Sequence, residues 1–337
     1  MSVRILIAVA LLAVAGCAKK EAAPAADGKP DRVRIGLVAK SLGNGFFDAV
    51  HKGAREASGE LDAEVIFVGP TTPTAEGQIE TLNSLIAQRV DAIAVSANDP
   101  DALLPTLKKA MDRGIKVVSY DSAVAAGGRN VHLAPSSDPL IGETVVALVA
   151  ELAPQVDGKA RGKFAVVSAT PTSTNQNAWL AEMRRALAQQ PGLEMVAVAY
   201  GDDVSDKSYR EAVALLRQHP DLAVLVSISS VGIVASAKAV EDEGLTGKVK
   251  VTGLGLPSEL AGYVQKGVVP KFAIWNPIDL GYSTLQVATY LARGGDISRP
   301  VPAGRMGTIS FGADGNGAMS KPFIYDAGNV AEFAKIF

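Results

Sequence analysis

The sequence predicts an α/β protein with two similar lobes, each a parallel sheet flanked by helices. Short apolar runs rich in β-branched residues alternate with amphipathic helical patterns over residues 33–293, as in right-handed βαβ units. The strand-like runs are about twice as many as one five- or six-stranded sheet needs. The chain also has 337 residues, of which 48% are apolar, too many for one ordinary domain.

The first series of elements opens at residues 33–38, a mostly apolar run typical of a buried strand. A polar turn follows it, and then a helical pattern. Further strands are expected at 64–68, 92–96, 116–120 and 130–133, and helices at 46–58, 75–89 and 101–113. Asp101 is placed as an N-cap and Gly114 as the residue that ends the last of these helices.

A break near residues 135–137 separates this series from a second one. The second series predicts strands at 163–168, 194–199, 223–228, 248–252 and 272–274. Its helices are expected at 139–152, 177–189, 206–218, 232–243, 258–266 and 280–293, before a tail poor in strands. Ligands of open α/β sheets bind outside the carboxyl ends of the strands, so the loops after these strands should carry the function.

The first residues read as an export signal. Residues 1–16 hold one basic residue and an apolar run too short for a permanent membrane span. Val14-Ala-Gly-Cys17 resembles the bacterial lipobox, which implies a lipid on Cys17, the single cysteine of the chain. Residues 17–31 are expected to form a flexible tether, with the protein held at a membrane in the periplasm or at the cell surface.

Composition and motifs argue against several other functions. A net charge of −2 gives no electrostatic reason to expect nucleic acid binding. The three histidines are far apart in the sequence, and neither a metal-binding spacing nor a serine nucleophile elbow is present. Gly43-Asn-Gly45 lacks the third glycine of a dinucleotide turn, and no Walker-type motif occurs. We therefore expect no metal, no cofactor and no enzyme activity.

The loops after the strands carry hydrogen-bonding groups beside aromatic rings, a combination that suits a small neutral polyhydroxylated ligand. The candidate ligand-binding residues are Lys40, Asn44, Phe46, Phe47, Ser96, Asp121, Asn175, Gln176, Ser229, Ser230, Trp275 and Asn276. Simpler roles stay open: Asp121 could cap a turn, and Asn175 and Gln176 could cap the helix that follows them. A partly buried Lys40 would need a partner, for which Asp121 is the obvious choice.

Several motifs resemble the periplasmic sugar-binding proteins of ABC importers. They are Lys40-Ser-Leu-Gly-Asn-Gly-Phe-Phe47, Gly69-Pro-Thr-Thr-Pro-Thr74, Ser96-Ala-Asn-Asp-Pro-Asp101, Thr172-Ser-Thr-Asn-Gln-Asn-Ala-Trp179 and Phe272-Ala-Ile-Trp-Asn276. The resemblance covers essentially residues 32–337. It is greatest to the branch of rhamnose-binding and autoinducer-2-binding proteins, and it implies a monomer that delivers L-rhamnose to a membrane permease. Autoinducer-2 is the alternative ligand.

Two departures from the autoinducer-2 group favour the rhamnose reading. By resemblance, Lys40, Asp121 and Gln176 match ligand-holding residues of that group directly, whereas Asn175 and Asn276 stand where it has acids. Amides donate as well as accept hydrogen bonds, which changes the set of ligand hydroxyls that the site can satisfy.

Residues 253–256, Gly-Leu-Gly-Leu, also lack the acid that ribose-type relatives carry, as a methyl-bearing 6-deoxy sugar would permit. The resemblance further implies a three-stranded hinge and two discontinuous lobes of the type I fold. We expect the N-terminal lobe at 32–135 plus 277–305, and the C-terminal lobe at 136–276 plus 306–337.

Overall fold

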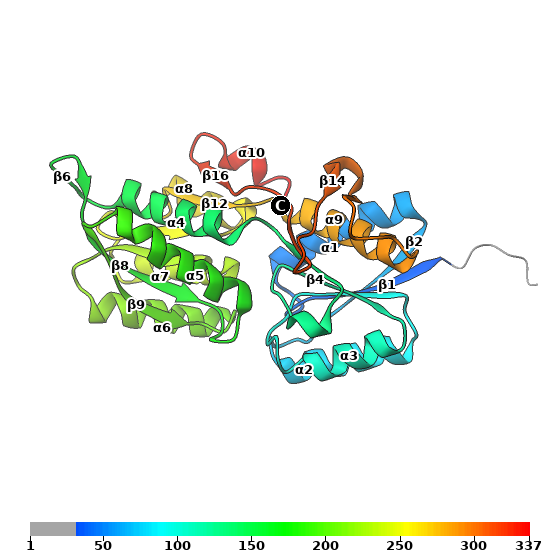
Figure 1. Ribbon diagram of the computed structural model, residues 1–337. Coiled ribbons are helices and arrows are strands. Elements are labelled where there is room, and N and C mark those ends of the chain that lie inside the picture. The colour runs from blue at the N-terminus through cyan, green and yellow to red at the C-terminus, as the bar shows by residue number, and fades with distance from the viewer. Residues whose placement is uncertain (1–31) are drawn as a thin grey trace, which may run out of the picture. The chain divides into compact units, whose positions relative to one another are not determined.

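The computed structural model describes residues 32–337, which contain two parallel sheets, each with helices on both faces (Figure 1). The α/β fold predicted from the alternating pattern is therefore confirmed. The expected signal peptide (residues 1–16), the tether (17–31) and the lipid site at Cys17 lie outside the described residues.

The first sheet has six parallel strands in the order β15-β5-β4-β3-β1-β2. Their bounds are β1 (Val33–Val38), β2 (Ala63–Val68), β3 (Ala92–Val95), β4 (Lys116–Tyr120), β5 (Val131–Ala134) and β15 (Asn316–Ala318). Helices α1 (Gly45–Leu61) and α9 (Pro277–Ala292) cover one face, and α2 (Ala75–Ala87) and α3 (Leu104–Asp112) cover the other. A short 3-10 turn, η1 (Ala126–Gly128), precedes β5.

The second sheet has four parallel strands in the order β11-β10-β8-β9. They are β8 (Gly162–Ser168), β9 (Leu193–Tyr200), β10 (Leu222–Ser227) and β11 (Lys250–Gly253). Helices α4 (Asp138–Leu152) and α5 (Thr174–Ala186) pack together, as do α6 (Ser205–Gln218) and α7 (Ser230–Asp242). The 3-10 turn η2 (Leu187–Gln189) extends α5.

Beside β11, a bridge from Leu254 to Ala273 brings in β12 (Lys271–Ile274), which pairs antiparallel with β16 (Phe323–Asp326). The remaining elements are helices α8 (Pro257–Gln265) and α10 (Val330–Phe333), the hairpin β6 (Gln155–Val156) and β7 (Lys159–Ala160), the pair β13 (Val301–Pro302) and β14 (Thr308–Ile309), and the turn η3 (Gly304–Met306).

Local capping signals set some of the helix ends. The Asn44 side chain caps α1 by accepting from the Phe46 amide, and Gly114 ends the α3 segment with a φ of +84°. The prediction of Asp101 as an N-cap is wrong. The Asp99 carboxylate accepts from the amides of Asp101 and Ala102 and holds them in a turn, so α3 begins only at Leu104.

Three segments connect the two sheets, as the type I fold requires. They are residues 135–137 between β5 and α4, residues 275–276 between β12 and α9, and residues 319–322 between β15 and β16. The last differs from the expected boundary at 305–306, because β15 pairs with β5 in the first sheet before the chain passes to β16. We use "first lobe" and "second lobe" for each sheet with its helices.

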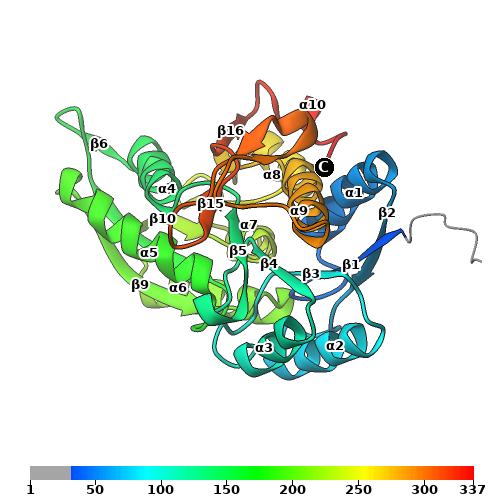
Figure 2. The ribbon, with the colours of Figure 1, turned by 45° about the vertical axis from the view of Figure 1, so that its right-hand side comes forward.

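The first lobe depends on a very close pair of helices, α1 and α9, which lie side by side in both ribbon views (Figures 1 and 2). Glycines permit the approach: a Cβ atom at Gly53 would lie 1.7 Å from the Ile278 carbonyl oxygen, and one at Gly281 would lie 1.8 Å from that of Val50. These two helices carry residues from distant parts of the chain to one end of the first sheet.

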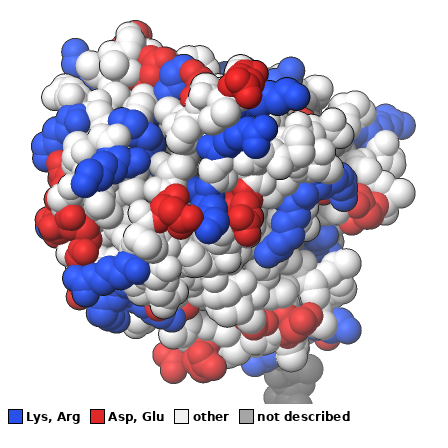
Figure 3. All heavy atoms as spheres, turned by 90° about the vertical axis from the view of Figure 1, so that its left-hand side faces the viewer, with Lys and Arg blue, Asp and Glu red and all other residues white. Residues whose placement is uncertain are grey.

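The surface charges and the hydropathy of the helices bear on two further roles, a charged binding patch and a membrane span. On the face shown in Figure 3, basic and acidic side chains are interspersed, and no broad patch of one sign forms there. Within residues 32–337, no helix combines the length and apolar character needed to cross a bilayer.

Candidate functional site

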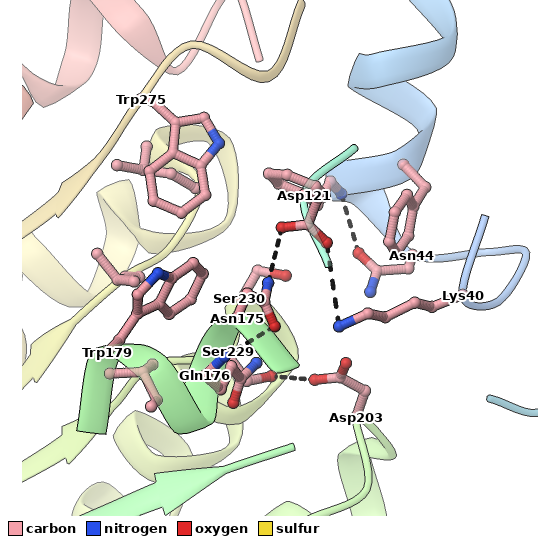
Figure 4. Close-up of a pocket in the computed structure, with 15 residues that line it drawn as sticks. Lys40, Asn44, Asp121, Asn175, Gln176, Trp179, Asp203, Ser229, Ser230 and Trp275 are labelled. Atoms are coloured by element: carbon pink, nitrogen blue, oxygen red, sulfur yellow. Dashed lines mark hydrogen bonds and ion pairs between the residues drawn. The ribbon is translucent and has the colours of Figure 1, made fainter. Parts of the chain in front are cut away.

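A cavity lies between the two lobes, at the carboxyl ends of the strands. Its mixture of apolar walls with a few polar groups is typical of small-molecule sites. The lining residues are Lys40, Asn44, Phe46, Phe47, Asp121, Asn175, Gln176, Trp179, Asp203, Ile228, Ser229, Ser230, Leu254, Ile274 and Trp275 (Figure 4).

The first lobe supplies an ion pair. Lys40 follows β1 and Asp121 follows β4, and Lys40 Nζ lies 3.9 Å from Asp121 Oδ2. Both residues are almost fully buried: 3% of the surface of Lys40 and 5% of that of Asp121 are exposed to solvent. The predicted partnership of Lys40 with Asp121 is therefore confirmed.

Asp121 is held by several groups at once. Ser96 Oγ donates to Oδ2 at 2.7 Å, and Asn175 Nδ2 donates to Oδ1 at 2.9 Å. Burial raises the pKa of the Asp121 carboxyl, while the Lys40 charge and these two donors lower it. The residue also has a φ of +55°, a backbone conformation that Asp tolerates better than most residues.

The second lobe presents two amides at the start of α5. Gln176 Oε1 accepts from Ser168 Oγ and from the Ala169 amide, each at 2.7 Å, which fixes this side chain in the cavity wall. Asn175 reaches across to Asp121. The N-cap position of α5 is Ser173, which makes no side-chain capping bond, whereas Asn175 Oδ1 accepts from the Gln176 amide in the first turn at 2.8 Å. Asn175 therefore caps the start of α5 as well as binding Asp121, and Gln176 does not act as a cap.

Four consecutive residues at this point bond directly to the first lobe. Their partners, in order, are the Asn98 carbonyl at 3.0 Å, Lys40 Nζ at 3.0 Å, the Ala123 carbonyl at 2.7 Å and Asp121 Oδ1 at 2.9 Å. The four residues are Thr172, Ser173, Thr174 and Asn175. These four hydrogen bonds join the two lobes at the cavity.

Aromatic rings form the apolar part of the wall. Trp275 makes edge contacts with Phe46 at 6.2 Å and with Trp179 at 5.5 Å between ring centroids. Phe46 and Phe47 both line the cavity. Trp275 Nε1 is buried without a hydrogen-bond partner among the described residues, whereas Trp179 Nε1 donates to Asp138 at 3.0 Å.

Ten of the predicted site residues come together in the cavity, and two do not. Ser96 lies behind Asp121 and bonds to it, and Asn276 caps α9 by accepting from the amides of Ile278 and Asp279. The five lining residues that were not predicted all come from the second lobe: Trp179, Asp203, Ile228, Leu254 and Ile274. An acidic turn directly after a strand, as at Asp203, is the one signal that could have been followed.

The chemistry of the wall is that of recognition. One ammonium group, two carboxylates, amides and hydroxyls surround a cavity bounded by apolar rings. Among residues 32–337, no group of three or more His, Cys, Asp or Glu side chains is placed to hold a metal ion.

Comparison with known proteins shows which family this chain resembles. A model of the periplasmic binding protein domain matches residues 35–296. A D-ribose/D-allose-binding protein of Pseudomonas aeruginosa is 30% identical over 231 residues, which cover 66% of this chain and 71% of that relative.

Solved structures agree. An ABC transporter solute-binding protein of Clostridium phytofermentas with bound L-rhamnose is 33% identical, with a TM-score of 0.84 over 91% of this chain and 99% of that one. LsrB of Clostridium saccharobutylicum in complex with AI-2 also has a TM-score of 0.84, over 89% of this chain and 99% of that one. At 22% identity, the LsrB likeness concerns the fold alone.

Proposed function

We propose that this chain, which belongs to the periplasmic binding protein family, binds a neutral sugar for an ABC importer. We propose further that this sugar is L-rhamnose. The family consists of binding proteins rather than enzymes, in agreement with the absence of catalytic motifs in the sequence. The observation that carries the proposal is the cavity itself, in which polar groups from both lobes converge beside aromatic rings.

The charges of the wall favour a neutral ligand. Lys40 is paired with Asp121, and Asp203 adds a second negative charge. A sugar phosphate or a sugar acid would bring further negative charge to a wall whose single cation is already paired. A neutral sugar instead satisfies the amides and carboxylates through its hydroxyls, and each hydroxyl left unpaired would cost about 1–3 kcal/mol.

The apolar part of the wall supports a deoxy sugar. Leu254, Ile228 and Ile274 line the second-lobe side of the cavity, and Leu254 belongs to the Gly-Leu-Gly-Leu segment that lacks an acid. A methyl group can rest against such a surface without leaving a polar atom unsatisfied. The L-rhamnose complex of the 33% identical Clostridium phytofermentas protein supports the same choice.

The test is a calorimetric titration of the purified protein with L-rhamnose, AI-2, D-ribose and D-allose in separate runs. We expect L-rhamnose to bind with micromolar or tighter affinity and AI-2 to give no heat. Binding of AI-2 with L-rhamnose silent would contradict the argument from Asn175 and Asn276. Binding of D-ribose or D-allose alone would assign the site to the sugar named for the Pseudomonas aeruginosa relative.

Export, a lipid on Cys17, a monomeric state and delivery of the sugar to a membrane permease complete the proposal. They rest on the N-terminal sequence pattern and on the family. In this scheme, hinge closure depends on the ligand binding the closed form better than the open form.

A further inference from the structure

Asp203, which was not among the predicted site residues, brings a second carboxylate to the cavity. It lies between β9 and α6, opposite the first-lobe residues Lys40 and Asp121 (Figure 4). Its charge acts on Asp121, where it adds to the effect of burial in raising the pKa of that carboxyl. The two acids therefore lie close enough in the cavity to sense each other.

One oxygen of Asp203 is fixed and the other is open. Ser229 Oγ donates to Oδ1 at 2.5 Å and accepts from the Gly232 amide at 3.1 Å as the N-cap of α7. The single hydroxyl proton of Ser229 is thus used on Asp203, which orients the carboxylate. Among the described residues no donor bonds Asp203 Oδ2, so this oxygen keeps its capacity to accept a hydrogen bond.

The turn that carries Asp203 is anchored to the second sheet. The Gly201 and Asp202 amides donate to the carbonyls of Ser168 and Ala169, the same two residues that fix Gln176. Asp202 and Asp203 have φ values of +55° and +53°. An acid held by such a backbone and by Ser229 loses little freedom when it binds a ligand, which makes it suited to discriminate between ligands.

We propose that Asp203 is a specificity-determining residue, which accepts a hydrogen bond through Oδ2 from one hydroxyl of the bound sugar. The inference rests on the proposed function and deepens it: the sugar must present one donor to the second lobe at Asp203, in addition to the groups that face Lys40 and Asp121. The competing role is purely structural, with Asp203 only supporting the Ser229 cap of α7.

The substitution Asp203→Asn separates these two roles. Asparagine keeps an oxygen that can accept from Ser229, and it tolerates a positive φ, so the cap and the turn are preserved. With its oxygen directed at Ser229, the amide turns its NH₂ group toward the ligand. A carboxylate acceptor is thereby exchanged for a neutral donor.

Asp202→Asn is the matched control. Asp202 has nearly the same φ, precedes Asp203 in the same turn, pairs with Lys207 at 2.5 Å and does not line the cavity. We expect Asp202→Asn to bind L-rhamnose within twofold of the wild type. We expect Asp203→Asn to bind it about 10–100-fold more weakly, as for loss of a hydrogen bond to a charged group. The thermal midpoint of the empty protein should be unchanged in both.

The decisive experiment titrates the wild type and Asp203→Asn with L-rhamnose and its monodeoxy analogues. In the wild type, one analogue should bind about 10–100-fold more weakly than L-rhamnose because Asp203 lacks its donor. In Asp203→Asn, the difference in affinity between that analogue and L-rhamnose should be much smaller, because a neutral amide donor replaces the charged acceptor. If D-ribose or D-allose is the ligand found, the same comparison uses that sugar and its deoxy analogues.

Each other outcome contradicts a stated claim. Equal affinity of the wild type and Asp203→Asn for the sugar overturns the inference and leaves the proposed function in place. A uniform loss for every analogue, with a lower thermal midpoint, assigns Asp203 to the structural role. A wild-type protein that binds none of the sugars overturns the proposed function, and the inference falls with it.

Discussion

The two tryptophans of the cavity differ in one hydrogen bond, and that difference predicts different roles. Trp179 Nε1 donates to Asp138, whereas Trp275 Nε1 is buried and has no partner among the described residues. A buried N–H without an acceptor costs free energy, and a ligand oxygen in the cavity could remove that cost. The donor of Trp275 is therefore placed for the ligand, and that of Trp179 for the protein.

Trp275→Phe should weaken L-rhamnose binding by about 3–10-fold, and the smaller buried ring should lower stability only through lost packing, since no protein hydrogen bond is removed. Trp179→Phe is the control: it leaves Asp138 without its donor, so it should lower the free energy of unfolding by about 1–3 kcal/mol with a smaller effect on affinity. Calorimetric titration and thermal denaturation of both variants measure these effects. The reverse pattern would show that Trp275 is structural.

Among single residues, those after a strand in the first lobe were the easiest to predict. Lys40 and Asp121 directly follow β1 and β4, and polar residues at strand ends have few roles other than caps and sites. Asp203 was missed because it follows another acid, Asp202, in the same turn, and the sequence pattern does not show which of the two faces the cavity. Only the tertiary structure shows that Asp203 faces the cavity while Asp202 pairs with Lys207.

At the scale of elements, the close packing of α1 on α9 makes two glycines indispensable. Gly53→Ala would place a Cβ atom 1.7 Å from the Ile278 carbonyl oxygen, and Gly281→Ala would place one 1.8 Å from that of Val50. Backbone atoms cannot move aside as a side chain can, so the helices would have to separate. We expect each variant to lose about 2–4 kcal/mol of unfolding free energy.

Gly59→Ala tests whether this loss is due to the helix contact. Gly59 is in the same helix, is exposed, and a Cβ atom there would meet nothing within 4 Å. Alanine favours helix, so this variant should gain about 0.5–1 kcal/mol. Chemical denaturation of the three variants gives the comparison. Equal effects at Gly53 and Gly59 would contradict the packing argument.

Elements with a strong periodic pattern could be predicted from the sequence, and those formed by long-range pairing could not. β1 and β4 have the predicted bounds, because a continuous apolar run between polar turns fixes both ends. β15 has three residues, Asn316–Ala318, with no apolar pattern, and it exists because β5 offers it a free edge. The expected lobe boundary at 305–306 differs from the structure because it left out this pairing of β15 with β5.

At the scale of the whole described structure, residues at the start of α5 bond the second lobe directly to the first. The four cross-lobe hydrogen bonds come from residues 172–175, and a typical net contribution is about 0.5–1.5 kcal/mol for each. These bonds stabilise the arrangement in which the two lobes meet at the cavity. Ligand binding then has to supply less free energy for closure. The apparent affinity for the ligand increases with the population of the closed form.

Thr174→Val tests this coupling between closure and affinity. Valine has the shape of threonine but removes the donor to the Ala123 carbonyl at 2.7 Å, and Thr174 does not line the ligand cavity. Loss of about 1 kcal/mol from the closed form should raise the dissociation constant for L-rhamnose about fivefold without changing the choice of sugar.

Thr144→Val is the matched control, because Thr144 Oγ1 donates to the Leu140 carbonyl within α4 and so within one lobe. It should change the thermal midpoint at most slightly and leave the affinity for L-rhamnose unchanged. Titration of both variants, with small-angle scattering of the empty proteins, separates closure from stability. Thr174→Val should scatter as a more open particle than Thr144→Val. Equal affinity and equal scattering of the two variants would mean that the hydrogen bonds at the start of α5 do not contribute to closure.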